Sequence, residues 1–226
     1  PYMGMILFLG LFACSLPLPA NRSVVVNKAE RPKLTFDKSL VWFMLSAMLL
    51  QMSVGPFYGF FVLYLKQVGY SETIAGMLVA LGVLAEIIIF FYSSRLIRQY
   101  GIRVLLVVSI LLTAVRWLLL AFGVEHVSLL VISQLLHAFT FGLVHAASIH
   151  FIHRHFSISH RSTGQALYAS VSFGVGGALG TWISGMIWGD GSSTMWVWVF
   201  AAACAFLSMI AVLLIPNING QPATNP

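Results

Sequence analysis

Six apolar stretches, each about as long as a membrane-crossing helix, follow one another along most of the chain. A helix needs about 20 apolar residues to cross the hydrocarbon layer of a bilayer. A membrane strand would instead be about ten residues long, with a polar residue at every second position, and the stretches lack that alternation. The pattern predicts transmembrane helices at residues 40–65, 72–94, 103–123, 127–150, 164–188 and 195–215.

The remaining segments predict how the chain is organised around these helices. Residues 1–18 are apolar and are interpreted as the end of a preceding transmembrane helix. A signal peptide is the alternative, but no basic segment stands before this run. Residues 19–39 are rich in charge and predict a hydrophilic linker, residues 40–216 form the bundle, and residues 217–226 form a tail. Because the chain starts at Pro1, we expect it to be truncated.

Composition agrees with a multi-pass all-α membrane protein. Hydrophobic residues make up 59% of the chain and charged residues only 8%, against about 25% charged in soluble domains. These values exclude a disordered chain and a disulfide-rich secreted module. Cys14 and Cys204 lie far apart in apolar runs, so a cysteine metal site is not expected.

The basic residues predict the orientation rather than nucleic-acid binding, although the net charge is +6. Cytoplasmic loops of membrane proteins are enriched in lysine and arginine. With the linker on the cytoplasmic side, only Lys66 lies outside and Arg116 within a span. The other ten of the twelve basic residues then lie on the cytoplasmic side: Arg22, Lys28, Arg31, Lys33, Lys38, Arg95, Arg98, Arg103, Arg154 and Arg161. The tail is expected to be cytoplasmic as well.

Three ionisable residues lie well inside predicted spans. A charged group at the bilayer centre costs about 3 kcal/mol, so such residues are functional candidates. Glu86 has no cation close by on its own helix, although it is also compatible with a protonated packing role. Arg116 cannot lose its charge and needs an anion or water. His137 belongs to a polar stripe on one helical face, formed with Gln134, Phe141, His145 and Ser148.

Small residues predict where helices approach one another. Ser172, Gly176, Gly180 and Ser184 recur every four residues, the spacing that allows close packing in lipid; a gating role is the alternative. The segment 55–59 contains two glycines and Pro56 and predicts a helix kink.

Several histidines and two arginines cluster at the cytoplasmic end of the span 127–150. Without neighbouring carboxylates and with arginines among them, they predict an interfacial basic loop rather than a metal site. The cluster contains His150, His153, Arg154, His155, His160 and Arg161. We expect no metal and no cofactor.

Six spans after a basic linker resemble the carboxy-terminal half of a major facilitator superfamily transporter. The basic loop 94–103 is similar to that superfamily's loop between paired helices, without its acidic residue. Residues 82–90, 115–117 and 134–141, with His145, resemble the 3-phenylpropionate transporter family more specifically. The lactose permease family is a more distant resemblance.

The resemblance implies a proton symporter with a cavity between two six-helix halves. Arg116 and His137 match the charge network of lactose permeases. The lysine and the glutamate of that network are replaced by Gln134 and Thr140. Glu86 therefore becomes the expected proton carrier, with Arg116 and His137 as its partners.

The resulting expectation is a secondary active transporter in a bacterial inner membrane, not an enzyme. It would carry protons with a small organic solute such as an aromatic acid; sugars and nucleosides are the alternatives. A missing amino-terminal half is expected to complete the cavity. A channel or receptor is a rival class, but neither a pore-lining ring nor a large ligand-binding segment is visible. Expected solute contacts are Gln51, Tyr58, Gln134, His145 and Tyr168.

Overall fold

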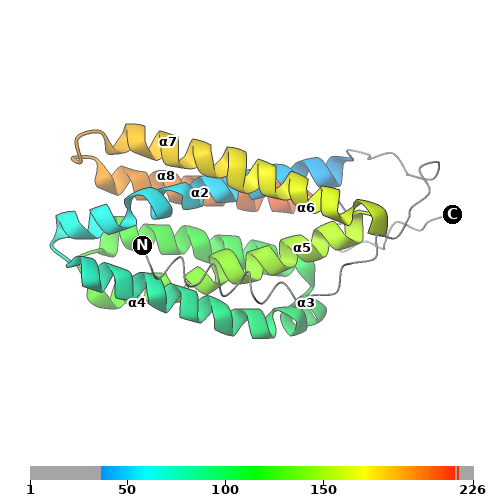
Figure 1. The fold of residues 1–226 in the computed structure, drawn as a ribbon, viewed down its shortest axis with the longest axis horizontal. Coiled ribbons are helices and arrows are strands. Elements are labelled where there is room, and N and C mark those ends of the chain that lie inside the picture. The colour runs from blue at the N-terminus through cyan, green and yellow to red at the C-terminus, as the bar shows by residue number, and fades with distance from the viewer. Residues whose placement is uncertain (1–36, 217, 219–226) are drawn as a thin grey trace, which may run out of the picture. The chain divides into compact units, whose positions relative to one another are not determined.

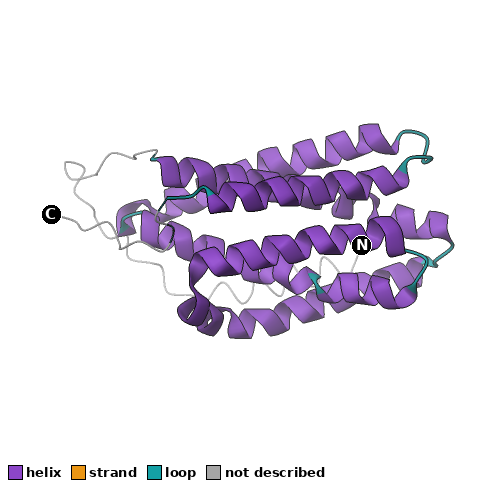
Figure 2. Ribbon diagram, turned by 180° about the vertical axis from the view of Figure 1, so that it is seen from behind, coloured by secondary structure: helices purple, strands orange, loops and turns teal. Residues whose placement is uncertain are grey.

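A computed structural model describes residues 37–216 and residue 218, which all belong to one compact unit. Within this part of the chain, helices and short connections make up the structure (Figures 1 and 2). In chain order the elements are α2 (Lys38–Val68), α3 (Glu72–Gly123), α4 (Val127–Leu135), the π-helical η2 (Phe139–Leu143), α5 (Val144–His155), the 3-10 helix η3 (Ile158–His160), α6 (Arg161–Ala169), the π-helical η4 (Ser170–Gly176), α7 (Gly177–Trp188) and α8 (Thr194–Leu213).

Among the described residues, five helical stretches are long and apolar enough to cross a membrane. They comprise α2, α3, the stretch Val127–His155, the stretch Ile158–Trp188, and α8. The prediction of an all-helical membrane protein is therefore confirmed. The first five predicted spans fall within these stretches, two of them within α3, and the sixth, 195–215, extends two residues beyond the end of α8.

A break at Gly101 divides α3 into two limbs. The 52 residues of α3 would form a rod about 78 Å long if they were straight, more than twice the hydrocarbon thickness. Gly101 has φ 78° and ψ 163°, which is not helical, and glycine adopts positive φ without a steric penalty. The chain turns back near this point (Figure 1). The limbs 72–100 and 102–123 correspond to the two predicted spans.

Two of the long helical stretches contain π-helical turns, which the sequence analysis did not predict. η2 lies between α4 and α5, and η4 lies between α6 and α7. A π turn holds more residues than an α turn and is often found at functional sites. The predicted polar stripe assumed uninterrupted α-helical spacing from Gln134 to Ser148. That assumption was wrong, because the helix changes type at Phe139.

Helix α2 packs against η4 and α7 through small residues. Ser172, Gly176, Gly180 and Ser184 are all buried, and a Cβ atom built on Gly180 would overlap the carbonyl oxygen of Met52. Close backbone approach of this kind is what small residues permit in membrane bundles. The packing interpretation is thus consistent with the structure, while the gating alternative stays a prediction.

The predicted kink segment of α2 takes part in the same contact. The helix continues through Pro56. The hydroxyl of Thr181 donates a hydrogen bond of 3.3 Å to the carbonyl oxygen of Gly55. Pro56 has no amide hydrogen to donate to the carbonyl oxygen of Met52, four residues earlier, whereas the Gly55 carbonyl receives this hydrogen bond from a neighbouring helix. The segment is therefore a docking point for α7.

Helix α8 closes the other side of the core. The Ser46 and Ser208 hydroxyls are 2.9 Å apart and join α2 to α8. The fully buried rings of Trp117 and Trp198 stack with centroids 5.7 Å apart, which joins α3 to α8. The buried face of the second limb of α3 is thereby held against α8.

Most of three predicted segments lies outside the described residues: residues 1–18, the linker 19–39 and the tail 217–226. At the described end of the linker, Asp37 caps α2 by accepting a 2.9 Å hydrogen bond from the amide of Leu40. The cytoplasmic orientation of these segments stays a prediction.

The small-residue contact predicts that Gly180→Ala destabilises the bundle. The added methyl group of the alanine must push α2 away from α7, and such overpacking lowers the free energy of unfolding by about 1–3 kcal/mol. Gly174→Ala is the matched control on the same helical stretch, because no atom of the described chain lies within 4 Å of its Cβ position. Thermal unfolding of the purified protein in detergent should show a lower midpoint for Gly180→Ala only. Equal midpoints for both variants would contradict the packing account.

Candidate functional site

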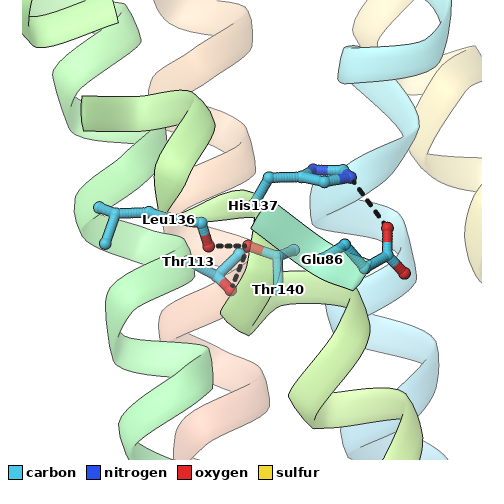
Figure 3. A network of polar contacts seen from close by, with 5 residues as sticks. All are labelled: Glu86, Thr113, Leu136, His137 and Thr140. Atoms are coloured by element: carbon cyan, nitrogen blue, oxygen red, sulfur yellow. Dashed lines mark hydrogen bonds and ion pairs between the residues drawn. The ribbon is translucent and has the colours of Figure 1, made fainter. Parts of the chain in front are cut away.

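An acid on the first limb of α3 and a buried histidine face each other. Glu86 lies on the first limb of α3, and His137 lies just before η2. Their closest atoms, Oε2 and Nε2, are 3.6 Å apart, and the two side chains are 22% and 6% exposed. Figure 3 shows the imidazole pointing toward the carboxylate. The distance is that of an ion pair and is longer than a normal hydrogen bond, so its strength depends on the protonation of both groups.

Arg116 on the second limb of α3 is fully buried. Its guanidinium carbon lies 4.5 Å from the ring centroid of Phe57 and 4.3 Å from that of Trp117. Within the described residues, none of its three side-chain nitrogens has a hydrogen-bond partner. Cation–π contacts contribute roughly 0.5–2 kcal/mol, which is less than the several kcal/mol that burial of an ion costs. The guanidinium is thus a strong unsatisfied donor in the interior.

Electrostatic interactions connect Glu86, Arg116 and His137 with neighbouring titratable side chains. Glu86 and Arg116 both act on the hydroxyl of Tyr58. Arg116 also acts on His137, and Glu86 acts on His145. Since α2, both limbs of α3 and the α4–α5 stretch contribute to this set, a change of charge at one member is felt on several helices. In the geometry, His137 lies 3.6 Å from Glu86, and the ring of Phe57 contacts both the guanidinium of Arg116, at 4.5 Å, and the ring of His137, at 5.5 Å.

A pocket lies beside this charge cluster. Its lining comes from α2, the second limb of α3, and the two helical stretches that contain π turns. The lining residues are Phe43, Ser46, Ala47, Leu50, Gln51, Leu106, Ile110, Thr140, Phe141, Val144, His145, Ser148, Tyr168 and Phe173. Most are aromatic or aliphatic, with a few hydroxyl, amide and imidazole groups among them. This mixture suits a small, largely apolar ligand with some polar atoms.

Three of the five predicted solute contacts line this pocket: Gln51, His145 and Tyr168. The ring of His145 lies 6.0 Å from that of Tyr168 and 6.4 Å from that of Phe173. Tyr58 and Gln134 are not part of the lining. Tyr58 is 68% exposed, whereas Gln134 is fully buried and its Oε1 has no hydrogen-bond partner among the described residues.

A contact between two threonines near the pair was not predicted from the sequence, in which Thr140 was noted only as the replacement of a glutamate. The hydroxyl of Thr113 donates a 3.0 Å hydrogen bond to that of Thr140, and joins the second limb of α3 to η2 (Figure 3). The sequence could have indicated them, because both are polar residues in apolar helices. Threonine is common in membrane helices because its hydroxyl can bond to its own backbone, so this signal was weak.

The histidines near the cytoplasmic end contact separate partners. His155 lies 3.4 Å from the carboxylate of Asp37, and His153 lies 2.8 Å from the amide of Gln165. His160 contacts Ser157 and Ser159. In the described ranges, no three histidine, cysteine or acidic side chains gather in a way that could hold a metal ion.

Comparisons with known proteins identify the family of this chain. Residues 1–200 match the family described as "MFS_1 like family". The chain is 32% identical over 177 residues to the "Probable 3-phenylpropionic acid transporter" of Escherichia coli strain K12, a match that covers 78% of this chain and 45% of the relative.

Its fold is similar to that of the nucleoside transporter NupG, seen in a crystal structure of a mutant. The TM-score is 0.68 at 18% identity, and the match covers 79% of this chain and 48% of NupG. The chain thus spans about half the length of the relatives that it matches. Most of the chain is covered by the family match, and the chain belongs to the MFS_1 like family of multi-pass membrane transporters, not to an enzyme family.

Proposed function

We propose that this chain forms one helical bundle of a proton-coupled symporter for small aromatic acids. The family membership and the coverage of about half of each relative support a second bundle of similar size. The two limbs of α3 give six crossings, consistent with one six-helix half of such a transporter. Exposed apolar side chains such as Ile88 and Phe91 on the first limb suit contact with lipid or with the second bundle.

The observation that carries the proposal is the set of the buried Arg116 and His137 with the partly buried Glu86. In an apolar interior these charges are costly, and a purely structural role would be expected to leave Arg116 fully paired. Its side-chain nitrogens instead have no hydrogen-bond partner in the described part of the chain. We infer that the guanidinium is reserved for an anionic solute.

Proton coupling follows from the acid–histidine pair. With Glu86 ionised and His137 protonated, the pair holds the first limb of α3 to the α4–α5 stretch. A proton taken up by Glu86 removes the negative charge and weakens this attachment. The protonation state of Glu86 then biases the bundle between two arrangements, as alternating access requires.

We infer the solute class from the pocket and from Arg116, which is fully buried and does not itself line the pocket. The lining aromatic rings suit a planar ring, and the guanidinium suits a carboxylate. The name of the E. coli relative supports an aromatic acid. The likeness to NupG concerns the fold and gives a nucleoside no additional support. We place the transporter in a bacterial inner membrane with the basic loops on the cytoplasmic side.

Glu86→Gln should abolish proton-driven accumulation in the assembled transporter. Glutamine is similar in size but cannot carry the proton, so uphill uptake into vesicles should be lost while counterflow of solute remains. Glu125→Gln is the control, because Glu125 is exposed in the connection between α3 and α4. Normal uphill uptake by Glu86→Gln would remove Glu86 from the coupling mechanism.

Arg116→Met should leave the bundle at least as stable as the unaltered protein. The substitution removes a buried cation without a hydrogen-bond partner and keeps most of the apolar volume. Trp117→Ala on the same helix should lower stability by about 3–5 kcal/mol, because it empties a fully buried site. Thermal unfolding in detergent compares the variants. A loss for Arg116→Met as large as that for Trp117→Ala would assign the arginine a structural role.

Uptake should distinguish an aromatic acid from its uncharged amide. An acid such as 3-phenylpropionate should compete about 10- to 100-fold better than the amide, because hydrogen bonds to a charged group are worth roughly 1.5–3 kcal/mol. Competition against labelled acid in vesicles measures this ratio. Equal competition by acid and amide would exclude a solute carboxylate at Arg116.

A further inference from the structure

The π-helical turn η2 lies between the pocket and the acid–histidine pair. Thr140 and Phe141, which belong to η2, line the pocket. His137 lies a few residues before the turn and faces Glu86. Any change in the turn therefore acts on both places.

Phe141 is the residue whose ring contacts both sides. It lines the pocket, and its ring centroid lies 4.9 Å from that of His137, at an interplanar angle of 34°. It also meets the ring of Tyr58 edge to face at 5.8 Å. Aromatic pairs at these distances contribute about 0.5–1.5 kcal/mol beyond burial, so the Phe141 ring helps to set the position of the imidazole.

The residues on either side of Phe141 fix the turn to both limbs of α3. Thr140 accepts the hydrogen bond from Thr113 on the second limb. Gly142 packs against the first limb, where a Cβ atom built on the glycine would lie 3.2 Å from Cγ of Glu86. Thr140 therefore contacts the second limb of α3, Phe141 contacts His137, and Gly142 contacts the first limb beside Glu86. The turn cannot move without moving the groups that make the pair.

We infer that Phe141 is the positioning residue that couples solute occupancy of the pocket to the Glu86–His137 pair. This inference rests on the proposed function and deepens it. A planar ring in the pocket packs against one face of Phe141, and the phenylalanine in turn holds the imidazole of His137 toward the carboxylate. Without the phenyl ring, the imidazole loses this support, and solute binding no longer changes the strength of the pair.

Other titratable and charged groups also act on the pair, and they bear on its pH dependence. Tyr58 on α2 interacts electrostatically with Glu86. Arg116 on α3 acts on His137, and His145 on α5 interacts with Glu86. A change at Phe141 leaves the charges of all these groups in place, although Tyr58 also loses its edge-to-face contact with the Phe141 ring.

The test measures protons taken up per solute molecule, together with the KM for an aromatic acid, in vesicles that contain the assembled transporter. Phe141→Leu should lower the proton-to-solute ratio at least twofold and raise KM. Phe141→Tyr keeps the ring and should restore the ratio. Phe173→Leu is the matched control: Phe173 also lines the pocket, and its ring contacts are with His145 and Tyr168. It should raise KM and leave the ratio unchanged.

The outcomes separate this inference from the proposed function. If the unaltered transporter moves solute without protons, the proposed function itself fails. If the unaltered transporter is coupled and Phe141→Leu has the same ratio as Phe173→Leu, only the role of Phe141 is overturned. Loss of counterflow in Phe141→Leu would also overturn it, because the ring would then be needed for solute passage. Phe141→Met, which fills similar space without a ring, replaces Phe141→Leu if the latter does not fold.

Discussion

The structure depends on holding charge inside an apolar bundle. Taking an ion out of water costs several kcal/mol, and lipid offers no compensating hydrogen bonds. Glu86 and His137 reduce this cost by facing each other at 3.6 Å, whereas the Arg116 guanidinium, within the described residues, lies over the ring faces of Phe57 and Trp117. We propose that a proton switches the first arrangement and that the second holds a cation for an anionic solute.

Close contacts between helix backbones position these charged residues, and the helix that carries His137 is less regular than the helices around it. Gly180 and its small neighbours bring α7 against α2, and the paired indoles of Trp117 and Trp198 anchor the second limb of α3. Around His137 the helix instead passes from α to π geometry. Rigid outer contacts and an irregular turn at the charged pair are what a bundle with two arrangements requires.

Much of the architecture could be predicted from the sequence because lipid imposes a simple rule on the chain. Long apolar runs located the spans, and the cost of buried charge identified Glu86, Arg116 and His137. The segment 94–103 was predicted to be a loop, but helix continues to Tyr100. Its residues are good helix formers, and only Gly101 provides the conformation that ends the limb.

The finer contacts of the site could not be predicted, because they depend on how helices deviate from ideal geometry. An α-helical stripe placed Gln134 on the same face as His145, but η2 shifts the spacing. Of these two residues only His145 lines the pocket, together with Phe141 and Ser148 from the same stripe. Phe141 was recognised as part of the stripe, yet its contact with His137 follows from packing rather than from spacing. Tyr58 is mostly exposed and lies outside the pocket, although both buried charges act on it.

The central claim is that Glu86 exchanges a proton when solute binds, and infrared difference spectroscopy of the assembled transporter tests it most directly. Adding an aromatic acid should change the carbonyl stretching band of a protonated carboxyl group. That change should be absent from a transporter carrying Glu86→Gln and should persist when Glu125 carries the same substitution. The same carboxyl band change in all three proteins would contradict the account, because the titrating acid would then lie elsewhere.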